Sequence, residues 1–107
     1  MKLQTYTRDD ATFIQCAGRL TAENSEALKN HVKSVIPHAK RIVLDLNDVT
    51  RMDSAGLGAV VGAYTSARKG KCDFLLINYN KSIKDLLGLT NLLSVFEACA
   101  RTNTRFP

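Results

Sequence analysis

The chain has 107 residues, a formal net charge of +5, 45% hydrophobic residues and 23% charged residues. This length fits one domain with a hydrophobic core and is too short for two. No apolar run approaches the roughly 20 residues of a membrane span, and the first residues lack a signal-peptide core, so we expect a cytoplasmic protein without membrane insertion. The basic residues are scattered and the aromatic residues few, which argues against a direct nucleic-acid site.

The first third of the chain predicts a hairpin followed by a helix. Lys2–Thr7 and Thr12–Ala17 have the pattern of two strands, joined by a polar turn, and Gly18 is expected to end the second strand. Thr21 is the predicted N-cap of a helix that ends at Pro37. The apolar residues with helical spacing are Leu28, Val32, Val35 and Ile36.

A second strand–helix unit carries the most informative sequence. Arg41–Leu46 is an apolar strand, followed by a predicted polar turn at Asn47-Asp48. Asp53 then precedes a new helical pattern and is its predicted N-cap. We expect this helix to run to Lys69, with a glycine, Gly70, as its C-cap.

The last part of the chain predicts one more strand–helix–strand unit. Cys72–Ile77 is a nearly continuous apolar strand of the kind found at the centre of a covered sheet. Asn80 or Ser82 is expected to cap a short helix closed by Gly88, and Ser94–Ala98 to form a final strand.

This order, ββαβαβαβ, predicts an α/β domain over residues 1–100, with a loose tail over residues 101–107. Alternating strands and helices imply a mixed, mostly parallel sheet of about five strands with helices packed on it. The loop that ends at Ser54 then lies at the C-terminal edge of the parallel strands, where such sheets usually carry function.

Ser54 is the residue with the clearest chemical role. It stands at the first helical position, where free backbone N–H groups and the helix dipole favour negative charge. A phosphate added to Ser54 would therefore be electrostatically favourable.

Catalytic, cofactor and metal motifs are incomplete. A nucleophile elbow needs glycine two residues before the serine, where Met52 stands. The glycine-rich stretch after Ser54 fails the dinucleotide pattern because Val61 replaces its third glycine, and no cluster has metal-ligand spacing. The sequence therefore predicts no enzyme, cofactor or metal. Three widely spaced cysteines indicate buried free thiols: Cys16, Cys72 and Cys99.

Three glycines in the predicted helix need a reason, since each costs roughly 1 kcal/mol relative to alanine. Packing on the sheet is the favoured explanation for Gly58 and Gly62. For Gly56, tight packing and a smooth surface for a partner are equal alternatives.

The sequence resembles the STAS domain (sulfate transporter and anti-sigma factor antagonist), in particular the free-standing anti-sigma factor antagonists of bacteria. The resemblance is carried by Ile42–Tyr64, with the pattern M-D-S-x-G-L-G, and extends to Gly18–Lys29 and Phe74–Phe96. In this family the serine that matches Ser54 is phosphorylated by a partner that is both a serine kinase and an anti-sigma factor.

The resemblance implies a protein-binding switch. The unphosphorylated antagonist binds the kinase and frees a sigma factor, phosphorylation prevents this, and a phosphatase resets it. The implied partner-binding residues are Thr21, Met52, Asp53, Ser54, Ala55, Gly56 and Leu57.

Three departures affect this expectation. Thr21 stands where the family often has an aspartate that contacts the kinase, Ala55 replaces a second hydroxyl, and no fourth C-terminal helix is recognisable in residues 100–107. The alternative function is a constitutive STAS scaffold, or a regulatory subunit of a signalling or transporter complex. A nucleotide-binding module at the helix start is disfavoured because no base-recognition group is visible.

Overall fold

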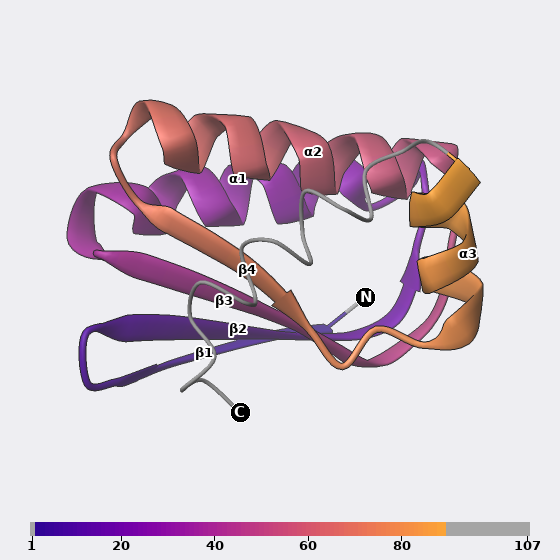
Figure 1. Ribbon diagram of the computed structural model, residues 1–107, viewed down its shortest axis with the longest axis horizontal. Helices are drawn as coiled ribbons and strands as arrows, with labels where there is room; N and C mark the ends of the chain where they lie inside the picture. The colour runs from indigo at the N-terminus through magenta and orange to yellow at the C-terminus, as the bar shows by residue number, and fades with distance from the viewer. Residues whose placement is uncertain (1, 90–107) are drawn as a thin grey trace.

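The protein is built on a mixed sheet in the order β1-β2-β3-β4, with α1 and α2 lying side by side on one face (Figure 1). The computed structural model describes residues 2–89. The strands are β1 (Lys2–Arg8), β2 (Ala11–Leu20), β3 (Arg41–Met52) and β4 (Asp73–Ile77). The helices are α1 (Ser25–Val35), the 3-10 turn η1 (Ile36–His38), α2 (Ser54–Lys69) and α3 (Lys81–Leu89).

The predicted hairpin and parallel crossovers are confirmed. β1 pairs antiparallel with β2 from Lys2↔Ala17 to Arg8↔Ala11, so Asp9 and Asp10 form the turn. Asp9 has a φ of 56°, a left-handed conformation that aspartate tolerates better than most residues. β2 pairs parallel with β3, and β3 parallel with β4.

The main core lies between the sheet and the two long helices. Alternate residues of β2, β3 and β4 meet the apolar stripes of α1 and α2, because side chains two apart in a strand share a face. The opposite face of the sheet carries a smaller buried cluster of Ala11, Phe13, Val43 and Leu75. The continuous apolar runs of β3 and β4 follow from burial on both faces. Cys72–Ile77 was predicted at the centre of the sheet, but among residues 2–89 β4 is an edge strand.

Two strands are longer than predicted. β2 continues past Gly18, which has a φ of 102°, and ends at Leu20. β3 continues through Asn47 and Asp48 to Met52, so the predicted polar turn is wrong. Register shifts between β2 and β3 accommodate these polar residues within the ladder. As a result, a single residue, Asp53, separates the end of β3 from the start of α2.

The start of α1 also differs from the prediction. The helix begins at Ser25, and Asn24 rather than Thr21 occupies the N-cap position. The Thr21 carbonyl accepts hydrogen bonds from the backbone N–H groups of Asn24 and Ser25, so Thr21 opens a turn that leads into the helix. As expected, α1 stops before Pro37, which lies in η1.

The other predicted helix ends are largely confirmed. Gly70 is the C-cap of α2, and the Asn80 side chain accepts a hydrogen bond of 2.9 Å from the N–H of Ile83 in α3. Gly88 does not close α3, which continues to Leu89. The predicted strand Ser94–Ala98, the tail 101–107 and Cys99 lie outside the described residues, in which the sheet has four strands.

Candidate functional site

Asp53 fixes the start of α2 with both its side chain and its backbone. Its Oδ1 accepts a hydrogen bond of 2.8 Å from the N–H of Gly56, and its carbonyl accepts one of 2.9 Å from the N–H of Leu57. Its own N–H donates to the carbonyl of Leu20 at the end of β2, 3.3 Å away. The predicted N-cap is therefore confirmed, and it ties the helix start to the sheet.

The exposed surface of the first turn of α2 is made of small side chains. Ser54 and Gly58 are exposed, and they lie on the same helix face because they are four residues apart. A methyl group built on Gly58 would meet nothing within 4 Å, so the predicted packing role of this glycine is wrong. Met52 and Ala55 are half-buried beside this surface. Ser54 thus projects from a smooth patch that another protein can approach closely.

Gly56 and Leu57 are buried and pack the first turn of α2 against the rest of the fold. A methyl group on Gly56 would lie 2.2 Å from the carbonyl oxygen of Leu20, so this glycine lets the helix start touch the end of β2. Packing is therefore the explanation for Gly56. Leu57 is 5% exposed and belongs to the core, so the structure does not present its side chain to a partner as predicted. At Gly62, a methyl group would lie 3.2 Å from Cε of Lys29, a packing contact as expected.

The loop between β2 and α1 forms the neighbouring wall of the site. The Asn24 side chain holds this loop by donating to the carbonyl of Arg19 at 2.6 Å and accepting from the N–H of Thr21 at 2.9 Å. A surface hollow of about 420 Å³ lies between this loop and Asp53. Thr21 and Asp53, both in the predicted partner-binding set, thus line the same hollow. The residues that line this hollow are Arg19, Thr21, Ala22, Glu23, Asn24 and Asp53.

Two arginines at this edge were not predicted as site residues. Arg19 and Arg51 are direct neighbours in the β2–β3 register, and both are exposed. They are 32 positions apart in the sequence, and their pairing depends on the register shift between Gly18 and Arg19. No local pattern in the sequence could have found this pair.

The buried thiols are unreactive at neutral pH. Cys16 and Cys72 are free and buried, as predicted. Burial, with a smaller contribution from the negative charge of Asp45, raises the pKa of Cys16 to about 12. Burial, and then the charge of Asp73, raises the pKa of Cys72 as well. Both thiols therefore stay protonated at neutral pH and are poor nucleophiles.

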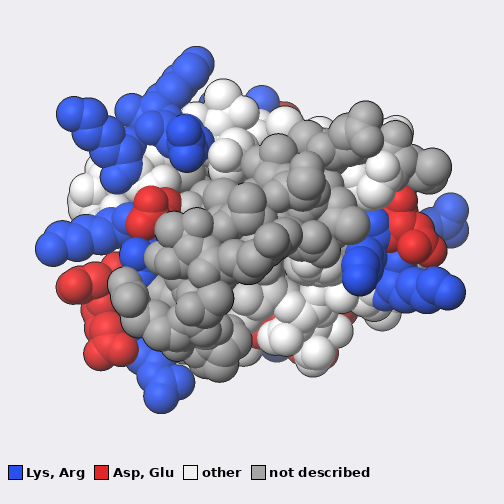
Figure 2. Space-filling view, in the orientation of Figure 1, with Lys and Arg blue, Asp and Glu red and all other residues white. Residues whose placement is uncertain are grey.

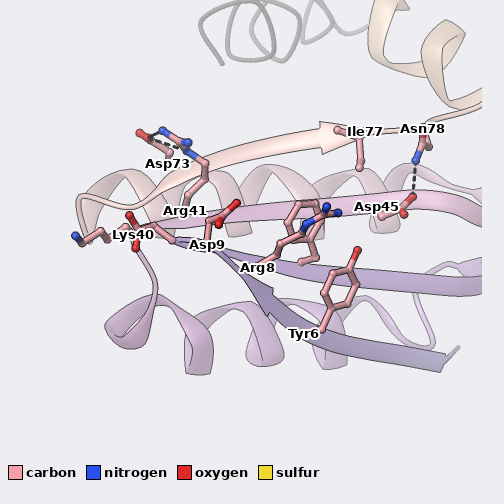
Figure 3. A pocket seen from close by; sticks show the side chains of 11 residues that line it. Tyr6, Arg8, Asp9, Lys40, Arg41, Asp45, Asp73, Ile77 and Asn78 are labelled. Atoms are coloured by element: carbon pink, nitrogen blue, oxygen red, sulfur yellow. Dashed lines mark hydrogen bonds and ion pairs between the residues drawn. The ribbon is translucent and has the colours of Figure 1, made fainter. Parts of the chain in front are cut away.

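A second hollow lies on the other face of the sheet and is lined by side chains of both charges (Figure 3). It has a volume of about 860 Å³. Nη2 of Arg41 lies 3.1 Å from Oδ2 of Asp73, and Nδ2 of Asn78 donates to Oδ1 of Asp45 at 3.1 Å. Tyr6 stacks on Phe13 at its rim, with ring centroids 5.1 Å apart. Because both basic and acidic side chains line this hollow, it does not favour a ligand of one charge.

Residues 2–89 contain no metal site and no membrane-spanning helix. No group of three or more His, Cys, Asp or Glu side chains in this range could hold a metal ion. No helix there is both long enough and apolar enough to cross a bilayer.

The arrangement of the sheet, the helices and the Asp53-Ser54 start of α2 matches a known family. A sequence model of the STAS domain matches residues 2–104. The chain belongs to the STAS domain family. The anti-sigma-B factor antagonist of Listeria monocytogenes is 32% identical to it over 90 residues, which are 82% of this STAS chain and 78% of the relative.

Solved structures show the same STAS fold. A Thermotoga maritima protein proposed to be an anti-sigma factor antagonist is 28% identical, with a TM-score of 0.77 over 84% of this chain and 79% of that chain. The Bacillus cell fate determinant SpoIIAA in its phosphorylated form is 18% identical, with a TM-score of 0.70 over 85% of each chain. An antagonist of an anti-sigma factor is a regulatory protein, so these relatives confirm the prediction of a non-enzymatic protein.

Proposed function

We propose that this STAS domain is an anti-sigma factor antagonist that is switched by phosphorylation of Ser54. In its unphosphorylated form it binds an anti-sigma factor that is also a serine kinase, and thereby releases a sigma factor. The observation that carries the proposal is the exposed Ser54 on the smooth first turn of α2, in a chain similar to an anti-sigma-B factor antagonist.

The position of Ser54 suits a phosphate group. Its side chain is exposed, so a kinase can reach the hydroxyl without unfolding the helix. The N-terminus of α2 carries partial positive charge, which stabilises an anion there by about 0.3–1 kcal/mol. The carboxylate of Asp53 lies in the same turn and opposes a second anion. These two effects have opposite signs, so we expect phosphorylation to change the stability of the fold little.

The same phosphate would disrupt a protein interface. It adds about two negative charges and three strongly hydrated oxygens to a surface otherwise formed by Ala55 and Gly58. A partner that packs closely against this surface would have to remove water from these charges without a prepared cation. Phosphorylation therefore blocks binding through the surface alone, and the fold does not need to rearrange. A phosphatase that removes the group restores binding.

Binding measurements with three forms of the protein test this proposal. Wild type, Ser54→Ala and Ser54→Asp are titrated by calorimetry against each anti-sigma factor kinase of the source organism. Ser54→Ala keeps the surface smooth and should bind within about threefold of wild type, whereas Ser54→Asp should bind at least about tenfold more weakly, a difference of 1.4 kcal/mol. Thermal unfolding of all three forms controls for folding.

Two other outcomes would contradict the proposal. Equal, tight binding by all three forms would indicate a constitutive STAS scaffold or regulatory subunit, in which Ser54 is an ordinary exposed residue. Retention of ATP or GTP in equilibrium dialysis without any kinase binding would indicate a nucleotide-binding module.

A further inference from the structure

Arg19 and Arg51 form a pair of like charges on neighbouring strands. Their Cα atoms are partners in the parallel β2–β3 ladder, so their side chains leave the sheet on the same face. The next residues along each strand, Leu20 and Met52, are also partners, and they pack against the main core. Because side chains alternate along a strand, both arginines point away from that core, and both are exposed.

This pairing does not stabilise the fold. Like charges directly opposite each other in a sheet are destabilising. Within residues 2–89, the carboxylate that forms an ion pair is Asp73, and it pairs with Arg41 at the other end of β3. Neither Arg19 nor Arg51 donates a side-chain hydrogen bond to another residue of that range. The fold therefore gains nothing from placing these two exposed cations side by side, and a binding partner is the other way in which the pair can contribute.

The arginine pair lies beside the proposed binding surface. Arg19 lines the hollow next to Asp53, and its carbonyl is held by Asn24. Arg51 stands three residues before Ser54 at the end of β3. Figure 2 shows Lys and Arg side chains at both ends of the long axis of the molecule, and the pair belongs to the end where the parallel strands finish. A partner that covers Ser54 and extends around the ends of β2 and β3 would therefore also meet this pair.

We propose that Arg19 and Arg51 bind carboxylate groups of an acidic segment on the anti-sigma factor kinase. This inference rests on the proposed function, because it concerns the partner of the same surface. The planar guanidinium groups suit bidentate recognition of carboxylates, and negative charges placed beside both arginines by an acidic partner would offset their mutual repulsion. The neighbouring Asp53 is engaged as a helix cap, and Thr21 adds no charge. Glu23 is the exposed anion in the hollow and opposes such a partner.

Charge-reversal variants test the pair. Arg19→Glu, Arg51→Glu and the milder Arg19→Gln and Arg51→Gln are titrated against the purified kinase that binds wild type, at 50 mM and 300 mM NaCl. Arg8→Glu is the matched control, because Arg8 is exposed at the hairpin on the opposite end of the sheet. Each reversal should weaken binding at least about tenfold and reduce its salt dependence, whereas Arg8→Glu should stay within about twofold.

Further readouts separate this role from a structural one. Arg51→Gln should have the same melting temperature as wild type or a higher one, because it removes a repulsive pair. Glu23→Gln should strengthen kinase binding. If the arginine variants bind like wild type while Ser54→Asp does not bind, the arginine proposal is overturned and the phosphorylation switch stands. If no kinase binds wild type, both proposals fail.

Discussion

The glycines at the start of α2 offer a matched test of how the site is built. Gly56→Ala and Gly58→Ala each add one methyl group to the same helical turn. Helix propensity alone should raise the free energy of unfolding of both variants by about 1 kcal/mol, because alanine loses less backbone entropy than glycine in a helix. At position 58 the methyl group meets nothing within 4 Å, so the full gain should appear as added stability.

At position 56 the methyl group collides with the backbone. It would lie 2.2 Å from the carbonyl oxygen and 2.9 Å from the carbonyl carbon of Leu20. This oxygen also accepts the N–H of Asp53, so the helix start cannot move away without weakening that bond. Overpacking of this kind costs about 1–3 kcal/mol. Since the propensity gain is common to both variants, Gly56→Ala should be about 1–3 kcal/mol less stable than Gly58→Ala.

Urea unfolding followed by circular dichroism measures this difference. For a domain of this size, each 1 kcal/mol should also move the melting temperature by about 4–8 °C. Equal stabilities of the two variants, within about 0.5 kcal/mol, would refute the described contact between α2 and β2. Gly58→Ala should also weaken kinase binding, because its added methyl group protrudes from the proposed interface.

The remaining predictions concern the cap and the thiol. Asp53→Ala should lose about 1 kcal/mol in urea unfolding, while Asp53→Ser, which keeps a capping oxygen, should lose less; equal losses would contradict the capping role. The Cys16 thiol has its pKa raised from 9.0 to about 12 in the folded state, so its contribution to stability is complete below pH 9 and falls as the pH rises toward 12. Over that range the unfolding free energy of wild type should fall more steeply than that of Cys16→Ala, by up to about 1.4 kcal/mol per pH unit; parallel curves would show that the thiol does not titrate differently in the two states.

Local signals in the sequence were sufficient for the elements that present Ser54. The apolar run of β3, the capping aspartate and the helical spacing after it are each set by neighbours a few residues away, and the structure agrees with all three. The polar pair Asn47-Asp48 was misleading because a strand can continue through exposed polar residues when its register shifts.

Contacts between distant segments could not be predicted in this way. The need for glycine at position 56 comes from the carbonyl of Leu20, and the Arg19–Arg51 pair exists only in the register of two strands. Leu57 was included among the partner-binding residues implied by the family resemblance, but its place in the apolar stripe of α2 turns its side chain into the core. In each case a tertiary contact decided the role of the residue.

Intact-mass spectrometry tests whether Ser54 accepts a phosphate from an anti-sigma factor kinase. Wild type and Ser54→Ala are incubated with ATP and each anti-sigma factor kinase of the source organism, and the mass of the STAS chain is followed over time. One kinase should add a single phosphate to wild type and none to Ser54→Ala. A phosphate that persists in Ser54→Ala, or no phosphate from any kinase that forms a stable complex with the chain, would contradict this prediction.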